Sequence, residues 1–102
     1  MIGSFGEGFS YTVEMTSAAH RVYKKLDPPV QRRIKAEVQE IAKAPNASPL
    51  LHGLPLPIRS HHFTQNGVHW RIAYTVNDMQ TKVTVVLLGV RENFYDRLKR
   101  LL

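Results

Sequence analysis

The chain has 102 residues, 14 Lys and Arg against 8 Asp and Glu, five His and no Cys, which gives a formal net charge of +6. A chain of this length fits one domain with one hydrophobic core. Without cysteine it can form neither a disulfide framework nor a Cys-based zinc site. No apolar run approaches the ~20 residues of a membrane helix, and residues 1–8 lack the features of a signal peptide. We therefore expect a small soluble domain of the cytoplasm with no membrane partner.

The basic charge favours a phosphate-bearing partner, because Lys and Arg displace condensed counterions when they bind nucleic acid. Residues 1–57 carry seven basic and five acidic side chains, whereas residues 58–102 carry seven and three. The second half also holds three of the five His. The positive charge is therefore concentrated in the C-terminal half.

The start of the chain predicts a strand followed by a helix. Residues 1–8 hold three of the six Gly and are expected to be a flexible lead-in, so that residues 9–102 form the single domain. Aromatic and apolar residues alternate over 9–15, which is typical of a short strand. Thr16 or Ser17 can cap a helix whose apolar residues recur at four-residue intervals up to Leu26.

A second helix is expected after Asp27-Pro28-Pro29, because Asp is a favoured N-cap and Pro is tolerated in the first helical turn. The apolar residues of this segment recur on one helical face. They are Val30, Ile34, Val38 and Ile41. Pro45 ends the helix, so the two helical segments predict a helical hairpin.

Residues 45–57 contain four Pro, which exclude both a helix and a central strand, and four Leu, which predict packing on the core. Three strands follow, over 58–63, 68–76 and 82–90. Turns at Gln65-Asn66-Gly67 and Asn77-Asp78 predict hairpins between them. The third strand is almost entirely apolar, which indicates a central strand buried on both faces.

These elements predict an α+β fold. We expect an N-terminal strand, a helical hairpin packed on one face of an antiparallel sheet with a three-stranded meander, and a short basic C-terminal helix over 94–102. The other face of the sheet is expected to stay partly open.

Arg71 stands in the middle of the second meander strand, where side-chain alternation directs it away from the apolar face that includes Trp70. A buried arginine without a partner is costly. It should therefore either pair with Glu92 or Asp96 or face a solvated cleft that binds an anion, and we favour the anion site. Arg91 follows the last strand, at a position where a rigid sheet often presents functional side chains.

Tyr95 follows Arg91 by four residues. It could reach the same cleft with its hydroxyl group or serve only as a packing residue.

Histidines supply candidate acid–base groups, since imidazole titrates near neutrality. Arg59 and His61 share one face of the strand at 58–63, whereas His62 lies on the other, and each His could equally be an ordinary hydrogen-bonded imidazole. Together with His69 they do not predict a metal site, because adjacent strand residues point to opposite faces and a metal needs three or four convergent ligands. We expect no metal and no other cofactor.

Phosphate chemistry would then have to proceed without a metal, because the chain has no glycine-rich phosphate loop and no paired carboxylates for Mg²⁺. RNA permits such chemistry, since its 2′-hydroxyl is a nucleophile beside the scissile phosphate. The protein must supply a base, an acid and fixed cations. Arg, His and Tyr can fill these roles. DNA lacks the internal nucleophile, so a metal-free nuclease of this composition would be an RNase.

Several short motifs occur in an order and spacing that resemble a known family. They are Ser17-Ala18-Ala19, Lys25-Leu26, Val30, Ile34, Pro45, Leu51-His52-Gly53-Leu54, His69-Trp70-Arg71-Ile72-Ala73-Tyr74 and Gly89-Val90-Arg91-Glu92-Asn93-Phe94-Tyr95. Over about residues 9–102 the chain resembles the RelE/ParE superfamily of bacterial toxin–antitoxin toxins.

The resemblance to the RelE-like branch implies an mRNA interferase, a metal-independent endoribonuclease that cleaves mRNA on the ribosome and inhibits translation. It implies that Arg71 is the transition-state arginine, Arg91 a second phosphate-contacting arginine and Tyr95 the terminal tyrosine. Where several nucleases of the family carry lysines, this chain has Arg59 and His61, or His62 if the register differs by one, so the general base stays open.

His62, His52 and Arg97 are further candidates for RNA binding. The resemblance also implies three partners: mRNA, the ribosome and a cognate antitoxin protein. ParE-like members inhibit DNA gyrase instead, so a gyrase inhibitor and a catalytically inactive binding module of the same fold are the alternatives.

Overall fold

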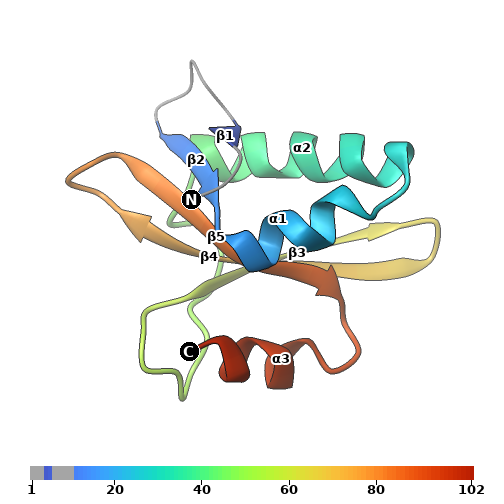
Figure 1. Ribbon diagram of the computed structural model, residues 1–102. Helices are drawn as coiled ribbons and strands as arrows, with labels where there is room; N and C mark the ends of the chain where they lie inside the picture. The colour runs from blue at the N-terminus through green and yellow to red at the C-terminus, as the bar shows by residue number, and fades with distance from the viewer. Residues whose placement is uncertain (1–3, 6–10) are drawn as a thin grey trace.

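The computed structural model describes residues 4–5 and 11–102, which form a five-stranded sheet with helices on both faces (Figure 1). The elements in chain order are β1 (Ser4–Phe5), β2 (Thr12–Met15), α1 (Ser17–Lys24), α2 (Pro28–Lys43), β3 (Arg59–Gln65), β4 (Val68–Asn77), β5 (Lys82–Val90) and α3 (Phe94–Leu101). The strand order is β1-β2-β5-β4-β3. The predicted α+β class, with its helical hairpin, meander and C-terminal helix, is confirmed.

The N-terminal strands lie beside β5. The strand expected over 9–15 begins at Thr12, and residues 9 and 10 lie outside the described residues. β2 pairs in parallel with β5, from Thr12 opposite Lys82 to Met15 opposite Val85. Within the expected lead-in, Ser4–Phe5 pairs antiparallel with β2, and the remaining residues of that segment lie outside the described ones. The apolar β5 is thus central, as predicted.

Thr16 joins the strand β2 to the helix α1. Its Oγ1 accepts a hydrogen bond from Ala19 N at 3.2 Å, as an N-cap does, and donates one to Val86 O at 2.8 Å. At the start of α2, Asp27 caps through its backbone oxygen, which accepts from Gln31 N, while its side chain makes no capping bond. Thr16 therefore fixes where α1 leaves the sheet.

The face of the sheet under α1 and α2 carries the larger core. The buried side chains of this core include Ile34 and Val38 from α2, Ile72 and Tyr74 from β4 and Val85 from β5. The predicted apolar stripe of α2 is confirmed: Ile34, Val38 and Ile41 are buried, and Val30 at the start of the helix is half-buried.

The opposite face carries a smaller core under α3. Figure 1 shows α3 on this side of the sheet. Ile58, Ala73 and Leu87 pack there against Phe94 and Leu98 of α3. Leu51 and Leu54 of the proline-rich segment join this cluster, which confirms that the segment packs on the core, whereas its other two leucines are exposed. This face is therefore covered by α3 and by the segment 45–57, and only partly, as predicted.

The meander places the polar residues of β3 and β4 in register. Asn66 and Gly67 both have positive φ (51° and 77°), so they form a two-residue turn and β3 runs on to Gln65, two residues further than predicted. A bulge between Ala73 and Tyr74 shifts the pairing of β4 with β5. No helix of the described residues is long and apolar enough to span a membrane.

Candidate functional site

A cleft of about 250 Å³ opens at the end of the sheet where β3, β4 and the end of β5 meet. It is lined by His62, Phe63, Thr64, His69, Trp70, Arg71 and Arg91. We call it the arginine cleft. Its walls are mostly polar, and it holds two guanidinium groups and two imidazoles, which suits an anionic ligand.

The two-residue turn of the β3–β4 hairpin sets the contents of the arginine cleft. It makes Thr64 the partner of His69 and His62 the partner of Arg71. Because residues two apart in a strand share a face, all four side chains lie on the same side of the hairpin. Arg91 follows β5 directly, and its backbone N–H donates to His69 O at 3.0 Å. This bond continues the ladder by one residue and places Arg91 beside His69.

Arg71 is half-buried and lies on the face opposite Ile72 and Tyr74. Within residues 4–5 and 11–102 it forms no ion pair, so the expected alternative of a pair with Glu92 or Asp96 is not what the structure shows. Arg91 likewise has no carboxylate partner in the described part of the chain, so two such arginines share the cleft. Such a pair is stabilised when a phosphate group binds between them.

His62 lies directly beside Arg71 in the cleft. Its Nε2 is 2.9 Å from Oγ of Ser60, a side chain that is 2 % exposed and lies on the same face of β3. Partial burial, then the positive charge of Arg71 and the neighbouring His61, lower the pKa of the His62 imidazole below its usual 6.5. His62 is consequently neutral near pH 7, the state in which an imidazole accepts a proton.

His69 is a cleft residue that was not among the candidates for catalysis or RNA binding. Its Nδ1 is 3.3 Å from Thr64 Oγ1, and its ring is exposed. The sequence contains the information that places His69 in the cleft. With a two-residue turn at Asn66-Gly67, the residue numbers of any two partners in β3 and β4 have the same sum. Counting outward from that turn places His69 next to Arg71 on the same face.

His61 lies on the other face of β3, against α2. Its Nε2 is 2.6 Å from Oε1 of Glu37, whose Oε2 accepts from Arg33 Nε at 2.9 Å. Burial alone would raise the pKa of the Glu37 carboxyl, but the hydrogen bonds and charges of His61 and Arg33 outweigh burial and lower it. The structure therefore separates His61 from Arg71, because strand alternation gives the cleft to His62.

Arg59 and Tyr95 are also outside the lining of the arginine cleft. Arg59 Nη1 donates to Ser48 O at 2.6 Å, and Tyr95 Oη donates to His52 O at 2.5 Å. Both bonds hold the segment 45–57, one to β3 and one to α3. The expectation that Tyr95 shares a cleft with Arg71 and Arg91 differs from the structure, since the first turn of α3 directs its hydroxyl to this segment.

The last two predicted site residues are Arg97 and His52, which were candidates for RNA binding. The backbone of exposed His52 accepts the Tyr95 bond, so the residue is placed over α3 and not in the cleft. Arg97 extends from α3 over Gly89, where a Cβ atom would come within 3.0 Å of its Nη1. Gly89 is the β5 partner of Arg71, so Arg97 adds positive charge beside the cleft without lining it. Among the described residues, no three His, Asp or Glu side chains converge as metal ligands would.

Comparison with known proteins points to one family. The family model for the ParE-like toxin of type II bacterial toxin-antitoxin systems matches residues 13–99. No curated protein matches the chain.

Solved structures of RelE toxins share the fold. A mutant of the E. coli toxin RelE in the free state has a TM-score of 0.71 at 22% identity, over 89% of this chain and 94% of that one. RelE in the intact E. coli RelBE toxin-antitoxin complex has a TM-score of 0.66 at 23% identity, over 80% and 98%. The RelBE2 complex from Mycobacterium tuberculosis gives a TM-score of 0.63 at 22% identity, over 84% and 97%.

Proposed function

Because the chain belongs to the ParE-like toxins of type II bacterial toxin-antitoxin systems, we propose that its arginine cleft is the active site of a metal-independent endoribonuclease that cleaves mRNA. The observation that carries this proposal is the convergence of Arg71, Arg91, His62 and His69 in one cleft, with no carboxylate paired to either arginine within the described residues. Fixed cations beside one group that accepts a proton and one that donates a proton are what cleavage of RNA without a metal requires.

In the proposed reaction the 2′-oxygen of the substrate attacks the adjacent phosphorus. His62 takes the 2′-hydroxyl proton. In the tautomer whose Nε2–H donates to Ser60 Oγ, 2.9 Å away, Nδ1 is free to act as the base. The new bond joins the 2′-oxygen to phosphorus, and the bond from phosphorus to the 5′-oxygen breaks. His69 is the proposed acid and gives a proton to the departing 5′-oxygen. The products are a 2′,3′-cyclic phosphate and a 5′-hydroxyl end.

The two arginines stabilise negative charge on the phosphate group of the substrate. Negative charge accumulates on the phosphate oxygens as the 2′-oxygen attacks, and preorganised guanidinium donors stabilise that charge more than they stabilise the ground state. Arg71, held in the strand β4, is the better positioned of the two, whereas Arg91 stands at a strand end and is exposed. We assign Arg71 to the transition-state oxygens and Arg91 to substrate phosphate.

The proposed partners are mRNA on the ribosome, reached in the cytoplasm, and a cognate antitoxin. The antitoxin proposal is supported by the family and by the solved complexes, in which RelE-like neighbours are bound to their antitoxins. Ribosome dependence is proposed from the resemblance to the RelE-like branch, whose fold this chain shares.

The test is cleavage of a defined RNA. The purified chain is added to a translation reaction, and the mRNA ends are mapped. In parallel it is added with EDTA to an isolated oligonucleotide and to the same oligonucleotide carrying a 2′-deoxy sugar at the mapped position. We expect cleavage with cyclic phosphate ends and none at the deoxy position. Intact mRNA together with unimpaired translation would overturn the nuclease proposal and favour a catalytically inactive binding module.

A gyrase inhibitor is the second candidate. The observation in its favour is that Arg59, His61 and Tyr95, three of the five predicted catalytic residues, lie outside the arginine cleft. A toxin that works by binding a protein needs none of them for chemistry. A gyrase supercoiling reaction with the purified chain separates the candidates: we expect no inhibition, and inhibition without mRNA cleavage would transfer the assignment to gyrase.

A further inference from the structure

The arginine cleft holds two imidazoles at positions related by the register of β3 and β4. His62 lies opposite Arg71. His69 lies two residues before Arg71 on β4, so the two histidines are diagonal neighbours on one face of the hairpin. Diagonal neighbours across an antiparallel pair are about 7–8 Å apart, a separation at which two rings can reach opposite sides of one phosphate group. The cleft can therefore hold a phosphate group with a proton-transferring ring on each side.

Each of the two rings has one nitrogen beside a hydroxyl group. Nε2 of His62 is 2.9 Å from Ser60 Oγ. Nδ1 of His69 is 3.3 Å from Thr64 Oγ1. No other hydrogen bond joins either ring to the described residues, so Nδ1 of His62 and Nε2 of His69 are available to a substrate. Each ring can thus exchange a proton with the substrate through its second nitrogen.

Cleavage of RNA as proposed above leaves the two histidines with exchanged protonation states. His62 has taken the proton of the 2′-hydroxyl, and His69 has given one to the 5′-oxygen. A second cleavage cannot start from this state, because the base is protonated and the acid is not. Partial burial and the positive charge of Arg71 lower the pKa of His62, so the protonated ring readily gives up its proton.

We propose that the arginine cleft has a second activity, in which it hydrolyses the 2′,3′-cyclic phosphate end of RNA to a 3′-phosphate. This inference rests on the nuclease proposal and adds a step to it. The cyclic end appears first and is then consumed, so the class of reaction that follows cleavage is hydrolysis of a phosphodiester in the same cleft.

The step reverses the roles of the two histidines. Water takes the place of the departed 5′-oxygen, gives a proton to Nε2 of His69 and forms a bond to phosphorus. The bond from phosphorus to the 2′-oxygen breaks, and His62 gives its proton to that oxygen. Arg71 stabilises negative charge on the phosphate oxygens, as in the first step. One water is consumed, and both histidines return to the states in which cleavage began.

The position of His62 also determines which bond breaks. In free solution water can open the cyclic phosphate at either the 2′- or the 3′-oxygen. In the cleft His62 stands beside the 2′-oxygen in both steps, so only that oxygen receives a proton as it leaves. The exposed ring of His69 leaves the other side of the phosphate group accessible to water. The product should therefore be a 3′-phosphate without a 2′-phosphate.

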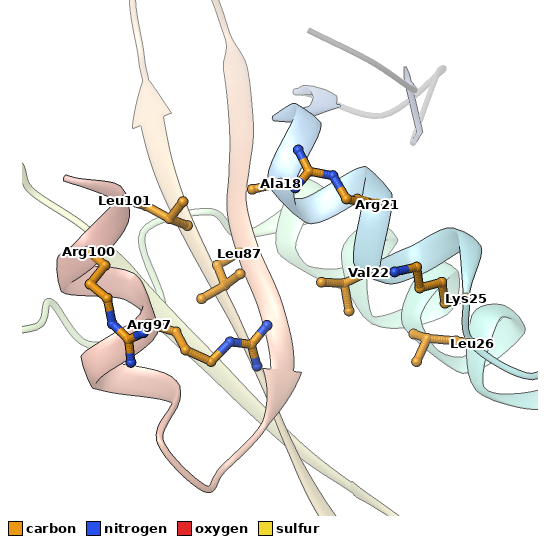
Figure 2. Close-up of a pocket in the computed structure, with 9 residues that line it drawn as sticks. All are labelled: Ala18, Arg21, Val22, Lys25, Leu26, Leu87, Arg97, Arg100 and Leu101. Atoms are coloured by element: carbon orange, nitrogen blue, oxygen red, sulfur yellow. The ribbon is translucent and has the colours of Figure 1, made fainter.

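A larger hollow between α1 and α3 lacks such a pair. Its volume is about 370 Å³, and it lies between helices on either side of β5 (Figure 2). The described residues that line it include four cations but no histidine, carboxylate or hydroxyl group. Arginine and lysine side chains are cations near neutrality, so they attract a phosphate group but do not accept a proton from water. The proposed hydrolysis is thus specific to the arginine cleft.

The test supplies the second step alone. An oligonucleotide of the mapped sequence that ends in a 2′,3′-cyclic phosphate is incubated with the purified chain, with and without ribosomes, in water enriched in a heavy isotope of oxygen. Mass spectrometry follows the gain of one labelled water, and phosphorus NMR distinguishes the 2′- from the 3′-phosphate. The variants are His62→Gln and His69→Gln, whose exposed rings can be replaced without emptying the core. His20→Gln is the matched control, because it removes an imidazole from α1, outside the arginine cleft.

We expect a 3′-phosphate that contains one labelled oxygen as the only product. His62→Gln and His69→Gln should each slow its formation by about 10²-fold or more, and His20→Gln by less than about 2-fold. A cyclic end that persists while the same preparation cleaves mRNA would overturn this inference and leave the nuclease proposal standing. A mixture of 2′- and 3′-phosphates, or equal rates in all three variants, would also overturn it. Intact mRNA would overturn the nuclease proposal and this inference together.

Discussion

His62 and Arg71 stand directly opposite each other on β3 and β4. A guanidinium group that stays charged at every physiological pH therefore adjoins an imidazole on the same face of the sheet. The positive charge disfavours protonation of His62, in addition to partial burial of the ring, and lowers the His62 pKa. This pairing gives the arginine cleft both a fixed cation and a neutral base near pH 7.

Replacing Arg71 should change the titration of His62. We expect Arg71→Gln to raise the His62 pKa toward 6.5, because one of the causes that lower it is removed. The measurement is an NMR titration of the His62 ring protons. Arg91→Gln is the matched control and should shift the His62 pKa less, since Arg91 is not among its causes. An unchanged His62 pKa in Arg71→Gln would contradict the inferred contact.

The same pKa makes folding depend on pH in a definite direction. The His62 pKa is lower in the folded than in the unfolded state. Between these two pKa values the unfolded chain therefore binds more protons than the folded chain. The contribution of His62 to stability is therefore present above about pH 6.5 and is lost as the pH falls through the folded pKa. Proton uptake by the proposed base should reduce RNA cleavage over the same range.

Arg71→Ala should abolish most RNA cleavage while leaving the protein folded. Removing one preorganised donor to a developing oxyanion costs on the order of 10²–10³ in rate. No carboxylate pairs with Arg71 in the described chain, so the substitution strands no buried charge and should not lower the melting temperature markedly. Cleavage and thermal unfolding are measured on one preparation. A folded, fully active variant would remove Arg71 from the mechanism.

Arg59→Ala provides the contrast. Arg59 donates to Ser48 O and lies outside the arginine cleft, so its loss should affect the anchoring of the segment 45–57 more than cleavage. Equal loss of cleavage in Arg59→Ala and Arg71→Ala would show that both act through overall charge and not through the geometry of the cleft.

Most of the architecture could be predicted because local signals agreed with one another. The stripe that contains Ile34 and Val38, the prolines at 28 and 29 and the Asn66-Gly67 turn each specify one element, and all are found as expected. The parallel placement of β2 beside β5 could not be predicted in this way. It depends on a contact between segments about 70 residues apart, for which neither strand carries a local signal.

Only part of the site could be predicted, because only part of it depends on local signals in the sequence. Side-chain alternation alone places Arg71 on the face opposite the larger core, and the structure agrees. Which histidine accompanies it depends on the register of β3 against β4, and this assigns the cleft to His62 and gives His61 to Glu37. The position of Tyr95 depends on how the segment 45–57 folds back over α3, which no periodicity in the sequence encodes.

Glu37 should stabilise the fold in a pH-dependent manner. Its pKa is lowered in the folded state, so its contribution is present above about pH 4.5 and is lost as the pH falls through the folded pKa. Glu37→Gln removes one charge from a half-buried network with His61 and Arg33 and should cost about 1.5–3 kcal/mol near neutrality. Thermal unfolding at several pH values measures the difference, which should shrink toward acid.

Glu40→Gln is the matched control for Glu37. Glu40 is on the same helix, and its contact with Lys43 at 3.5 Å is exposed, so its loss should cost less than about 0.5 kcal/mol. If the two variants unfold at the same temperature, the network of Glu37 with His61 contributes nothing measurable, and His61 would return as a candidate for the reaction.

Tyr95→Phe should separate an anchoring role from a catalytic one. The Tyr95 hydroxyl donates to His52 O at 2.5 Å, and a Cβ atom at the next residue, Gly53, would lie 3.4 Å from that hydroxyl. Loss of the bond should cost about 0.5–1.5 kcal/mol and loosen the segment 45–57, seen as faster amide exchange at residues 51–54. RNA cleavage at a temperature where the variant is fully folded should stay within about 2-fold of the wild type, because the hydroxyl is directed away from Arg71. A fall of about 10²-fold or more without a change in stability would instead place Tyr95 in the reaction and require α3 to move when RNA binds.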